Sequence, residues 1–468
     1  MLPILPMLII IPFLSLIAVA VLDVKHAYPI ALTASAITFV LSIIAILYSY
    51  FNGTAALSFS LAYVPELNLM LSLTLTQTTL LLVTMTSTIF FAASIVGSYF
   101  IGSKDRIYNI IFLLAEGASI GVFISASLFF LFVFWEISEV MMFFIIFLYG
   151  GYNRRYAGIK FIIYSIISSM LLLIGILVLY NAVTPHTFNI QSIIADSAAI
   201  PRTTQLLVLI LFVFSFMIKM PIFPLHNWLP DAHTEAPTTG SMILAGVLLK
   251  FGGYGMYLMF LMLPIASYYS QYLFLLFILS TIYSGFVCIS QTNIKRLIAY
   301  TSITDMGIVA VGLASLNHFG STGAVYAMFS HGIAISVLFL VAGTLDEIYG
   351  TLDINRIKGV VKNFSGLTYL FIISVFAALG IPLTAGFVAD LLVFIGSVSA
   401  FGFFGLIPIL GILLIGVALF WVIERVFMSS SKALEPYNPL SKSVMASGVL
   451  LIAVAIAFGI FPLLFLSL

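Results

Sequence analysis

Two lysines in this sequence lie inside apolar runs, where a charge is costly. Lys219 and Lys250 both fall in the segment 216–255, and Lys219 directly precedes a Pro-x-x-Pro break at Pro221 and Pro224. A charged side chain at the middle of a bilayer costs on the order of 2.5–3.5 kcal/mol on insertion scales. The cost falls if the group pairs with an opposite charge or becomes neutral. A buried lysine beside an acid is therefore poised between two protonation states, which is the chemistry of a proton relay.

Six ionisable residues within predicted spans are candidates for such a relay: Glu136, Lys219, Lys250, Asp305, His331 and Asp390. At 1.5 Å per residue, Glu136 lies about 15 Å and Lys250 about 20 Å into its helix, near the middle of a hydrocarbon layer roughly 30 Å thick. The alternative is that these residues form static ion pairs, and that His331 is a packed, hydrogen-bonded histidine. Two further acids, Glu116 and Glu139, are expected to be pairing groups or to face a water cavity.

The composition indicates a polytopic membrane protein. The 468 residues are 63% hydrophobic and 7% charged, whereas about a quarter of the residues in an average soluble protein are charged. The first residues, 1–14, contain no basic residue, so we expect a retained first span and not a cleaved signal peptide. The sequence has no basic face and no polar, aromatic-rich surface of the kind that binds nucleic acid.

We expect no cofactor and no metal ion in this chain. The single cysteine, Cys288, excludes an internal disulfide, an iron–sulfur cluster and a multi-thiolate metal site. Four metal-capable side chains follow the Pro-x-x-Pro break, but their spacing matches no standard zinc site: His226, Asp231, His233 and Glu235.

A membrane-spanning helix needs roughly 20 apolar residues, and the sequence contains 14 such segments. Every span should be a helix, because an open sheet cannot satisfy its backbone in lipid. The predicted spans are 2–22, 28–51, 72–101, 107–124, 126–150, 157–182, 204–226, 237–262, 268–290, 296–315, 321–344, 366–396, 402–428 and 442–467. The longest polar pieces, 52–68, 183–202 and 345–365, are predicted to be short connections or surface helices.

The basic residues support this count. Of the 17 lysines and arginines, 14 fall on one side when the loops are assigned alternately. The other side has only Arg202, and Lys219 and Lys250 lie within spans. Because basic loops stay inside, both termini are predicted to lie on the outer, periplasmic side.

Proline positions indicate an internal repeat. The seventh span breaks at Pro221 and the twelfth at Pro382, five spans apart. Two five-helix units separated by an odd number of spans are inverted relative to each other. We therefore predict three helices over 1–106, inverted repeats over 107–262 and 268–428 with discontinuous helices 7 and 12, and a fourteenth helix over 442–468.

Several motifs across spans 4 to 13 resemble one family, the antiporter-like subunits of respiratory complex I. The motifs are Phe134-Trp135-Glu136, Lys219-Met220-Pro221, Pro224-Leu225-His226, Trp228-Leu229-Pro230-Asp231-Ala232-His233, Ala236-Pro237-Thr238 with Leu248-Leu249-Lys250, and the run from Lys295 to Ile303 (KRLIAYTSI). Subunits of Mrp antiporters and of energy-converting hydrogenases belong to the same group of relatives. The resemblance implies 14 core helices and two inverted repeats.

The resemblance also implies roles for single residues. Glu136 and Lys219 would form the pair of the first half-channel, Lys250 would be the central carrier, and Asp390 would be the outlet. An acid at the outlet, and a chain that stops after the last span, resemble the M-type subunit, whose mitochondrial counterpart is subunit 4. In the tenth span, where the family has its first histidine, this sequence has Asp305. His331 matches the family's second histidine. We expect Asp305 to relay protons together with His331.

The sequence thus predicts a proton-translocating membrane subunit of a complex I-type quinone oxidoreductase, driven by redox chemistry in other subunits. L-, N- and K-type subunits would be its neighbours in an energy-converting bilayer, and a prokaryotic cell membrane is favoured over the mitochondrial inner membrane. Alternatives are a subunit of an Mrp-like Na⁺/H⁺ antiporter, a membrane subunit of an energy-converting hydrogenase, and a scaffold with inactive sites. The sequence leaves open whether H⁺ or Na⁺ moves and which donor supplies the electrons.

Overall fold

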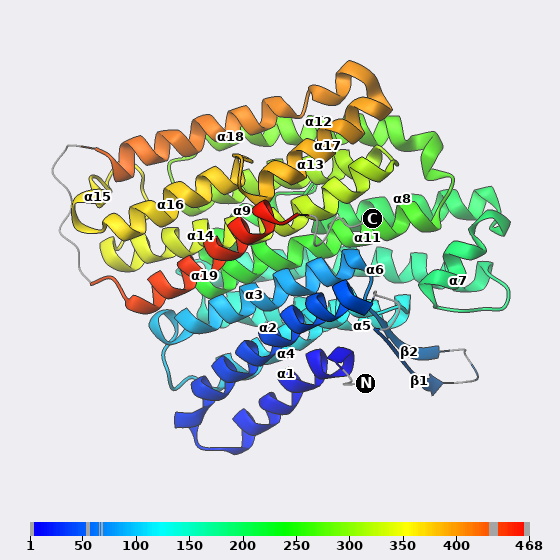
Figure 1. Cartoon of the computed structure of the whole chain (residues 1–468), viewed down its shortest axis with the longest axis horizontal. Coiled ribbons are helices and arrows are strands. Elements are labelled where there is room, and N and C mark those ends of the chain that lie inside the picture. The colour runs from blue at the N-terminus through cyan, green and yellow to red at the C-terminus, as the bar shows by residue number, and fades with distance from the viewer. Residues whose placement is uncertain (1–3, 53–56, 65, 67–68, 430–438, 463–468) are drawn as a thin grey trace.

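The computed structural model describes residues 4–52, 57–64, 66, 69–429 and 439–462. In this part of the chain, 14 helices are long and apolar enough to cross a membrane, as predicted. They run side by side as one bundle (Figure 1). The first three long helices are α1 (Ile4–Val21), α2 (Ala27–Asn52) and α3 (Gln77–Phe100).

The next five spans contain the first helix break. Their elements are α4 (Arg106–Ile124), α5 (Leu128–Tyr149), α6 (Arg154–Ala182), α8 (Arg202–Lys219), and α10 (Thr238–Ile243) continued by a π-helical segment (Leu244–Leu248) into α11 (Leu249–Met262). Two short helices, α7 (Ile190–Ala195) and α9 (Trp228–Glu235), lie in the connections before and after α8.

The remaining spans contain the second break. Their elements are α12 (Ala266–Ile289), α13 (Ile294–Ala314), α14 (His318–Tyr349), α16 (Ser365–Ala378), α17 (Ala385–Phe401), α18 (Ile409–Val422), which continues as a π-helical segment (Ile423–Phe427), and α19 (Lys442–Ile460). A single turn, α15 (Val360–Asn363), precedes α16. Short 3₁₀ turns lie at Val24–His26, Ser197–Ala199 and Gly402–Leu406.

A β-hairpin corrects the prediction for the segment before α3. Strands β1 (Ser58–Val64) and β2 (Leu69–Thr74) pair antiparallel, with Leu61 opposite Leu71. The segment was predicted to be a connection followed by a span from residue 72. Its apolar and polar residues alternate, which is the period of a strand, and one face of β2 is buried at Leu69 and Leu73. Helix α3 begins only at Gln77, after a capping box at Thr76.

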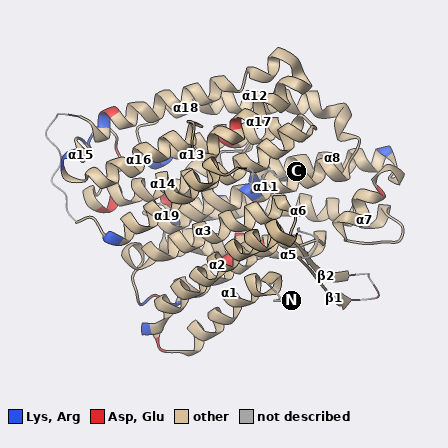
Figure 2. Cartoon of the chain, in the orientation of Figure 1, with Lys and Arg blue, Asp and Glu red and all other residues tan. Residues whose placement is uncertain are grey.

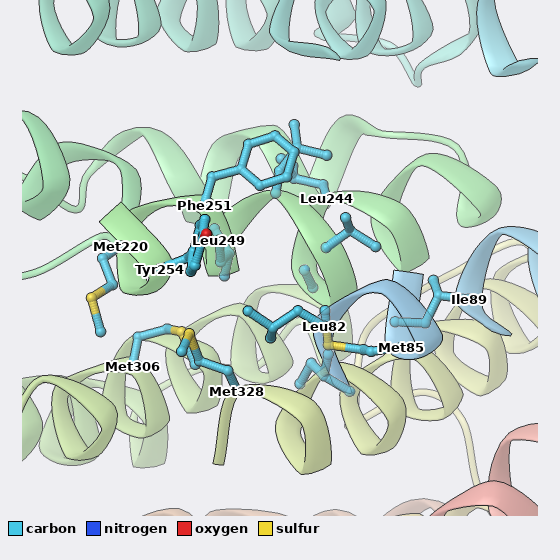
Figure 3. Packing of buried hydrophobic residues seen from close by; sticks show 14 of the residues in the cluster. Leu82, Met85, Ile89, Met220, Leu244, Leu249, Phe251, Tyr254, Met306 and Met328 are labelled. Atoms are coloured by element: carbon cyan, nitrogen blue, oxygen red, sulfur yellow. The ribbon is translucent and has the colours of Figure 1, made fainter. Parts of the chain in front are cut away.

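The centre of the bundle is α14, which has 32 residues and whose most apolar window is 100% buried. The peripheral helix α1 is only 33% buried by the same measure. Sulfur and branched side chains fill the spaces around the centre: Met220, Met306 and Met328 lie close to one another, and Leu82 and Met85 face the π-helical segment (Figure 3). Methionine fits such irregular spaces because its side chain is unbranched and flexible.

Both predicted helix breaks are present. Helix α8 ends at Lys219, two residues before Pro221, and the chain becomes helical again at Trp228. Helix α16 ends at Ala378, and α17 begins at Ala385, after Pro382. Proline cannot continue the hydrogen-bond ladder of a helix, which explains both positions.

Lysine and arginine gather at one end of the bundle (Figure 2). This is the end at which the described part of α1 finishes, near Lys25, and at which α19 begins, at Lys442. Helix α1 therefore begins, and α19 ends, toward the opposite end (Figure 1). The charge distribution fits the assignment of loops made from the sequence.

Gly380 provides a test of the second break. Its φ is +63°, and a Cβ there would lie 2.3 Å from Asp390 Oδ2. Gly380→Ala should destabilise the chain by about 1–3 kcal/mol from the backbone strain and should displace the Asp390 carboxyl in addition. The measurement is thermal unfolding of the full-length chain in lipid nanodiscs.

Gly350→Ala is the matched control, because Gly350 has the same φ, +63°, in the left-handed region at the end of α14, and it is exposed. It should show the backbone strain alone. Equal losses in the two variants would contradict a contact between Gly380 and Asp390.

Candidate functional site

The first cluster of buried charges joins α5 to α8. Lys219 Nζ lies 2.5 Å from Glu139 Oε1, and the two side chains are 1% and 2% exposed. The same carboxylate oxygen accepts a hydrogen bond of 2.5 Å from Trp135 Nε1. Lys219 is the last residue of α8, where a cation is favoured by the negative end of the helix dipole.

Glu139, and not Glu136, is the ion-pair partner of Lys219, which corrects the expected pair. Glu136 lies one turn earlier on α5, beside Ser169, and interacts electrostatically with both Lys219 and Glu139. Its Oε1 is buried and has no hydrogen-bond partner among the described residues. Residues three apart share a helix face, so both acids face α8. Helix α8 ends at the level of Glu139, and its last side chain reaches that acid.

Two aromatic rings lie close to the ammonium of Lys219. Its Nζ lies 5.1 Å from the centroid of the Phe161 ring and 5.9 Å from that of Trp228. Trp228 begins α9 and donates a hydrogen bond of 2.8 Å from Nε1 to the carbonyl of Ile218. The break after α8 therefore folds the chain back so that Trp228 covers Lys219.

The second cluster lies on three helices. Lys250 Nζ on α11 is 2.7 Å from His331 Nδ1 on α14. His331 Nε2 is 3.7 Å from Asp305 Oδ2 on α13. An amine, an imidazole and a carboxyl thus follow one another, and the imidazole contacts both of the others. This is the arrangement in which a proton can pass through a histidine from one ring nitrogen to the other.

A local irregularity of the helix positions Lys250. The segment Leu244–Leu248 is π-helical, and the carbonyl of Ala245 accepts a hydrogen bond of 2.6 Å from Lys250 Nζ. A π-helical turn widens the helix and disturbs its i→i+4 bonds, so carbonyls become available to side chains. The buried amine therefore has a backbone acceptor on its own helix in addition to His331.

A small cavity separates Asp305 from Asp390. Its lining includes both carboxyls together with Ser330 and His331, and it has about 20 Å³ of space for a water centre. A polar cavity of that size holds about one water. Asp390 on α17 therefore continues the second cluster across a gap that a single water can bridge. Among the described residues, no direct hydrogen bond or ion pair joins this cluster to the Lys219 cluster.

The four metal-capable residues after the first break do not come together. His226 packs on Phe223 and Tyr283, and His233 stacks on Phe339 at 4.4 Å between ring centroids. Asp231 instead pairs with Lys160 at 2.6 Å and Arg296 at 3.0 Å. Glu235 accepts a hydrogen bond from the backbone of Asn153. Across the described ranges, no group of three or more His, Cys, Asp or Glu side chains could hold a metal ion.

The glycines of the run Gly252-Gly253-Tyr254-Gly255 permit close helix packing. A Cβ at Gly252 would lie 2.8 Å from the backbone nitrogen of Met220, and one at Gly255 would lie 2.3 Å from the Phe216 ring. Helix α11 therefore approaches the end of α8 closely, next to Lys219. Small residues permit such approach between membrane helices.

Comparison with known proteins places the chain. A family model described as NADH:quinone oxidoreductase/Mrp antiporter, TM, matches residues 125–416. NADH-quinone oxidoreductase subunit M of Rickettsia felis is 35% identical over 373 residues, which are 79% of this chain and 75% of that protein. This chain belongs to the NADH:quinone oxidoreductase/Mrp antiporter family. Subunit M of Rhodobacter capsulatus is 31% identical and matches 97% of this chain and 93% of its own length.

Solved structures share the fold of this family member. Respiratory complex I from Thermus thermophilus contains a chain with a TM-score of 0.89 and 24% identity, covering 97% of this chain and 96% of that one. A chain of the Mrp complex from Dietzia sp. DQ12-45-1b has a TM-score of 0.85 and 18% identity, covering 98% and 95%. The resemblance to antiporter-like subunits, and to the M type in particular, is confirmed by the subunit M relatives.

The two acids of α5 give a test of the observed ion pair. Glu139→Gln removes the ion-pair partner of the buried Lys219 and should cost about 3–5 kcal/mol of stability. Glu136→Gln removes a carboxyl that has no ion-pair contact within 4.0 Å and should cost much less. Thermal unfolding of the two variants in nanodiscs gives the comparison. A larger loss in Glu136→Gln would show that Glu136 holds Lys219.

His226 provides a test in the loop after the first break. Burial lowers the pKa of His226 from 6.5 to about 4, and neither ring nitrogen has a hydrogen-bond partner within the part of the chain that the structure describes. The unfolded chain therefore binds a proton here at a higher pH than the folded chain does, so stability falls as the pH falls from 6.5 toward 4. His226→Phe should reduce this acid sensitivity, measured as the difference in unfolding temperature between about pH 7 and about pH 5.

The exposed His318→Phe is the control and should leave that difference unchanged. An unaltered acid sensitivity in His226→Phe would contradict a buried, neutral His226.

Proposed function

We propose that this chain is a proton-translocating membrane subunit of a complex I-type quinone oxidoreductase, driven by electron transfer in other subunits. The observation that carries the proposal is a spatial series of buried side chains: Lys250, His331, Asp305 and, across the cavity, Asp390. Lys250 lies within hydrogen-bond distance of His331, and His331 lies 3.7 Å from Asp305. The cavity between Asp305 and Asp390 has room for one water. The relatives named NADH-quinone oxidoreductase subunit M support the kind of complex.

The second cluster can conduct a proton without any change of oxidation state. Lys250 as an ammonium donates to His331 Nδ1, and transfer of that proton leaves a neutral amine that Ala245 and His331 still solvate. His331 then releases the proton of Nε2 toward the Asp305 carboxylate, and its ring returns to a neutral tautomer. Asp305 passes the proton to Asp390 through a water in the cavity.

The first cluster can control the charge of Lys219. Its ion pair with Glu139 stabilises the ammonium, and Glu136 offers a second carboxyl one turn away on α5. A small movement of α8 relative to α5 would exchange one acid for the other. During the exchange Lys219 loses its close counter-charge, which favours release of its proton in an apolar surrounding. We assign the pair of the first half-channel to Lys219 with Glu139 and Glu136 together.

The arrangement in the membrane follows from the same proposal. The units 107–262 and 268–428 act as inverted repeats, each with one broken helix. Both chain termini lie on the outer side of a prokaryotic cell membrane, because the basic loops stay inside. L-, N- and K-type subunits lie beside this one in the assembled complex, and those of its partners that hold redox centres supply the driving force. This chain itself carries no redox chemistry.

Replacement of Asp305 tests the proposal. Asp305→Asn keeps the shape and removes the group that accepts a proton from His331. The number of protons pumped per electron should fall by roughly half or more, or coupled activity should fall about tenfold, while the complex still assembles. The measurement is dye-monitored proton uptake and electron transfer by the purified complex in liposomes.

Asp353→Asn, in a surface loop, is the matched control and should change neither quantity. Pumping with an unchanged ratio in Asp305→Asn would refute the relay through Asp305. Sodium-driven proton movement in liposomes that receive no electron donor would instead identify an Mrp-like antiporter.

A further inference from the structure

Glu116 is a fully buried acid that belongs to neither of the two clusters of buried charges. It lies on α4 and faces α2, where Ser35 Oγ is 2.6 Å from its Oε2 and Thr38 Oγ1 is 2.5 Å from its Oε1. All three residues have no exposed surface. Phe13 of α1 packs against the neighbouring Gly117, where a Cβ would lie 2.9 Å from the ring. The carboxyl is thus enclosed between α4 and α2, with α1 packed alongside.

No positive charge compensates Glu116. Within their described residues, α1, α2 and α3 contain no Asp, Glu, Lys, Arg or His. Arg106 is the basic residue of α4 itself, about 15 Å along the helix, and its guanidinium donates to backbone carbonyls of Ala20 and Leu22.

The titratable groups on the other helices packed against α4 also lie elsewhere. The acids of α5, Glu136 and Glu139, belong to the Lys219 cluster, and Lys250 of α11 contacts Ala245 and His331. Among the described residues, the hydrogen-bond partners of the Glu116 carboxyl are Ser35 and Thr38, and no tyrosine is one of them. An isolated carboxylate in such a place would carry a large desolvation cost.

The hydrogen bonds around Glu116 leave a place for one more proton than an ionised carboxylate carries. The Thr38 hydroxyl contacts two acceptors, the Ser35 carbonyl at 2.9 Å and Glu116 Oε1 at 2.5 Å. One hydroxyl hydrogen can serve only one of them. If Oε1 carries a proton, it donates to Thr38, Thr38 donates to the Ser35 carbonyl, and Ser35 Oγ donates to Oε2. All contacts are then satisfied.

We propose that Glu116, Ser35 and Thr38 form a proton-binding site between α2 and α4. This site is separate from the two clusters of buried charges, and it holds Glu116 as a neutral carboxylic acid. The ligand is a proton and not a metal ion, because the oxygens touch each other at hydrogen-bond distance and leave no gap between them. The site does not depend on the relay, since neither cluster shares a residue with it.

Infrared spectroscopy of the full-length chain in lipid nanodiscs tests this site. At neutral pH, the difference between wild type and Glu116→Gln should contain the carbonyl band of a protonated acid, which shifts in D₂O. Glutamine keeps the size and both hydrogen-bond contacts, so the variant should fold. Carboxylate bands in the same difference spectrum would overturn the proposal.

Two hydroxyl variants make the test independent of the folding of Glu116→Gln. Thr38→Val removes the acceptor of the acid proton and should shift the carbonyl band. Ser42→Ala is the matched control, because Ser42 lies on the same helix but bonds to Ser87 at 2.8 Å, and it should leave the band unchanged. An identical band in wild type and Thr38→Val would overturn the assignment.

A comparison of spectra with and without sodium tests whether the site binds a proton or a sodium ion. Replacement of choline chloride by sodium chloride at constant ionic strength and pH should leave the acid band in place. Loss of the band in sodium would mean that a metal ion displaces the proton, and the site would not be the proton site proposed here.

Discussion

An amine buried among apolar helices must find an acceptor, and regular helices offer none because their carbonyls are already bonded. Both buried lysines solve this at an interruption of the helical pattern. Lys219 is the last residue of α8, where the helix stops and an acid of α5 comes within reach. Lys250 lies two residues after the end of a π-helical segment whose Ala245 carbonyl it contacts. Breaks that weaken a helix thus provide what the charges need.

The second requirement is a rigid frame that keeps the groups at fixed distances. Helix α14 supplies it, since it is buried along its most apolar window and packs against α13, α16, α17 and α19. His331 lies on this helix and contacts Lys250 on one side and Asp305 on the other. The imidazole therefore has little freedom to move. In the proposed relay, a proton would therefore move by rotation of bonds and exchange of water, without a large displacement of helices.

Much of the fold could be predicted because it follows from hydrophobicity and proline. Long apolar runs gave the helices, and Pro221 and Pro382 gave the breaks. The hairpin at Ser58–Thr74 was missed because a short alternating segment beside long apolar runs carries a weak signal. The π-helical segment has no sequence signature. Within it, Gly246 lies close to Ser336, so that a Cβ at Gly246 would meet the serine hydroxyl at 2.5 Å.

The candidate site could be predicted by residue type but not by partner. Lys219 needed an acid, and α5 presents two on one face, so only the level at which α8 ends decides between Glu136 and Glu139. The contact of Lys250 with His331 joins residues 81 positions apart, and no local pattern indicates it. Glu116 is similar, because the hydroxyls that surround it come from α2, 78 and 81 residues away.

The π-helical turn before Lys250 has a further geometric meaning. A helix advances by about 100° per residue, and a π turn holds one more residue than an α turn does. If Leu244–Leu248 became regular α-helix with the same number of residues, everything after it would rotate by about 100° around the helix axis. The amine of Lys250 would then leave His331 and face another neighbour. The π-helical turn therefore determines which neighbouring helix the side chain of Lys250 faces.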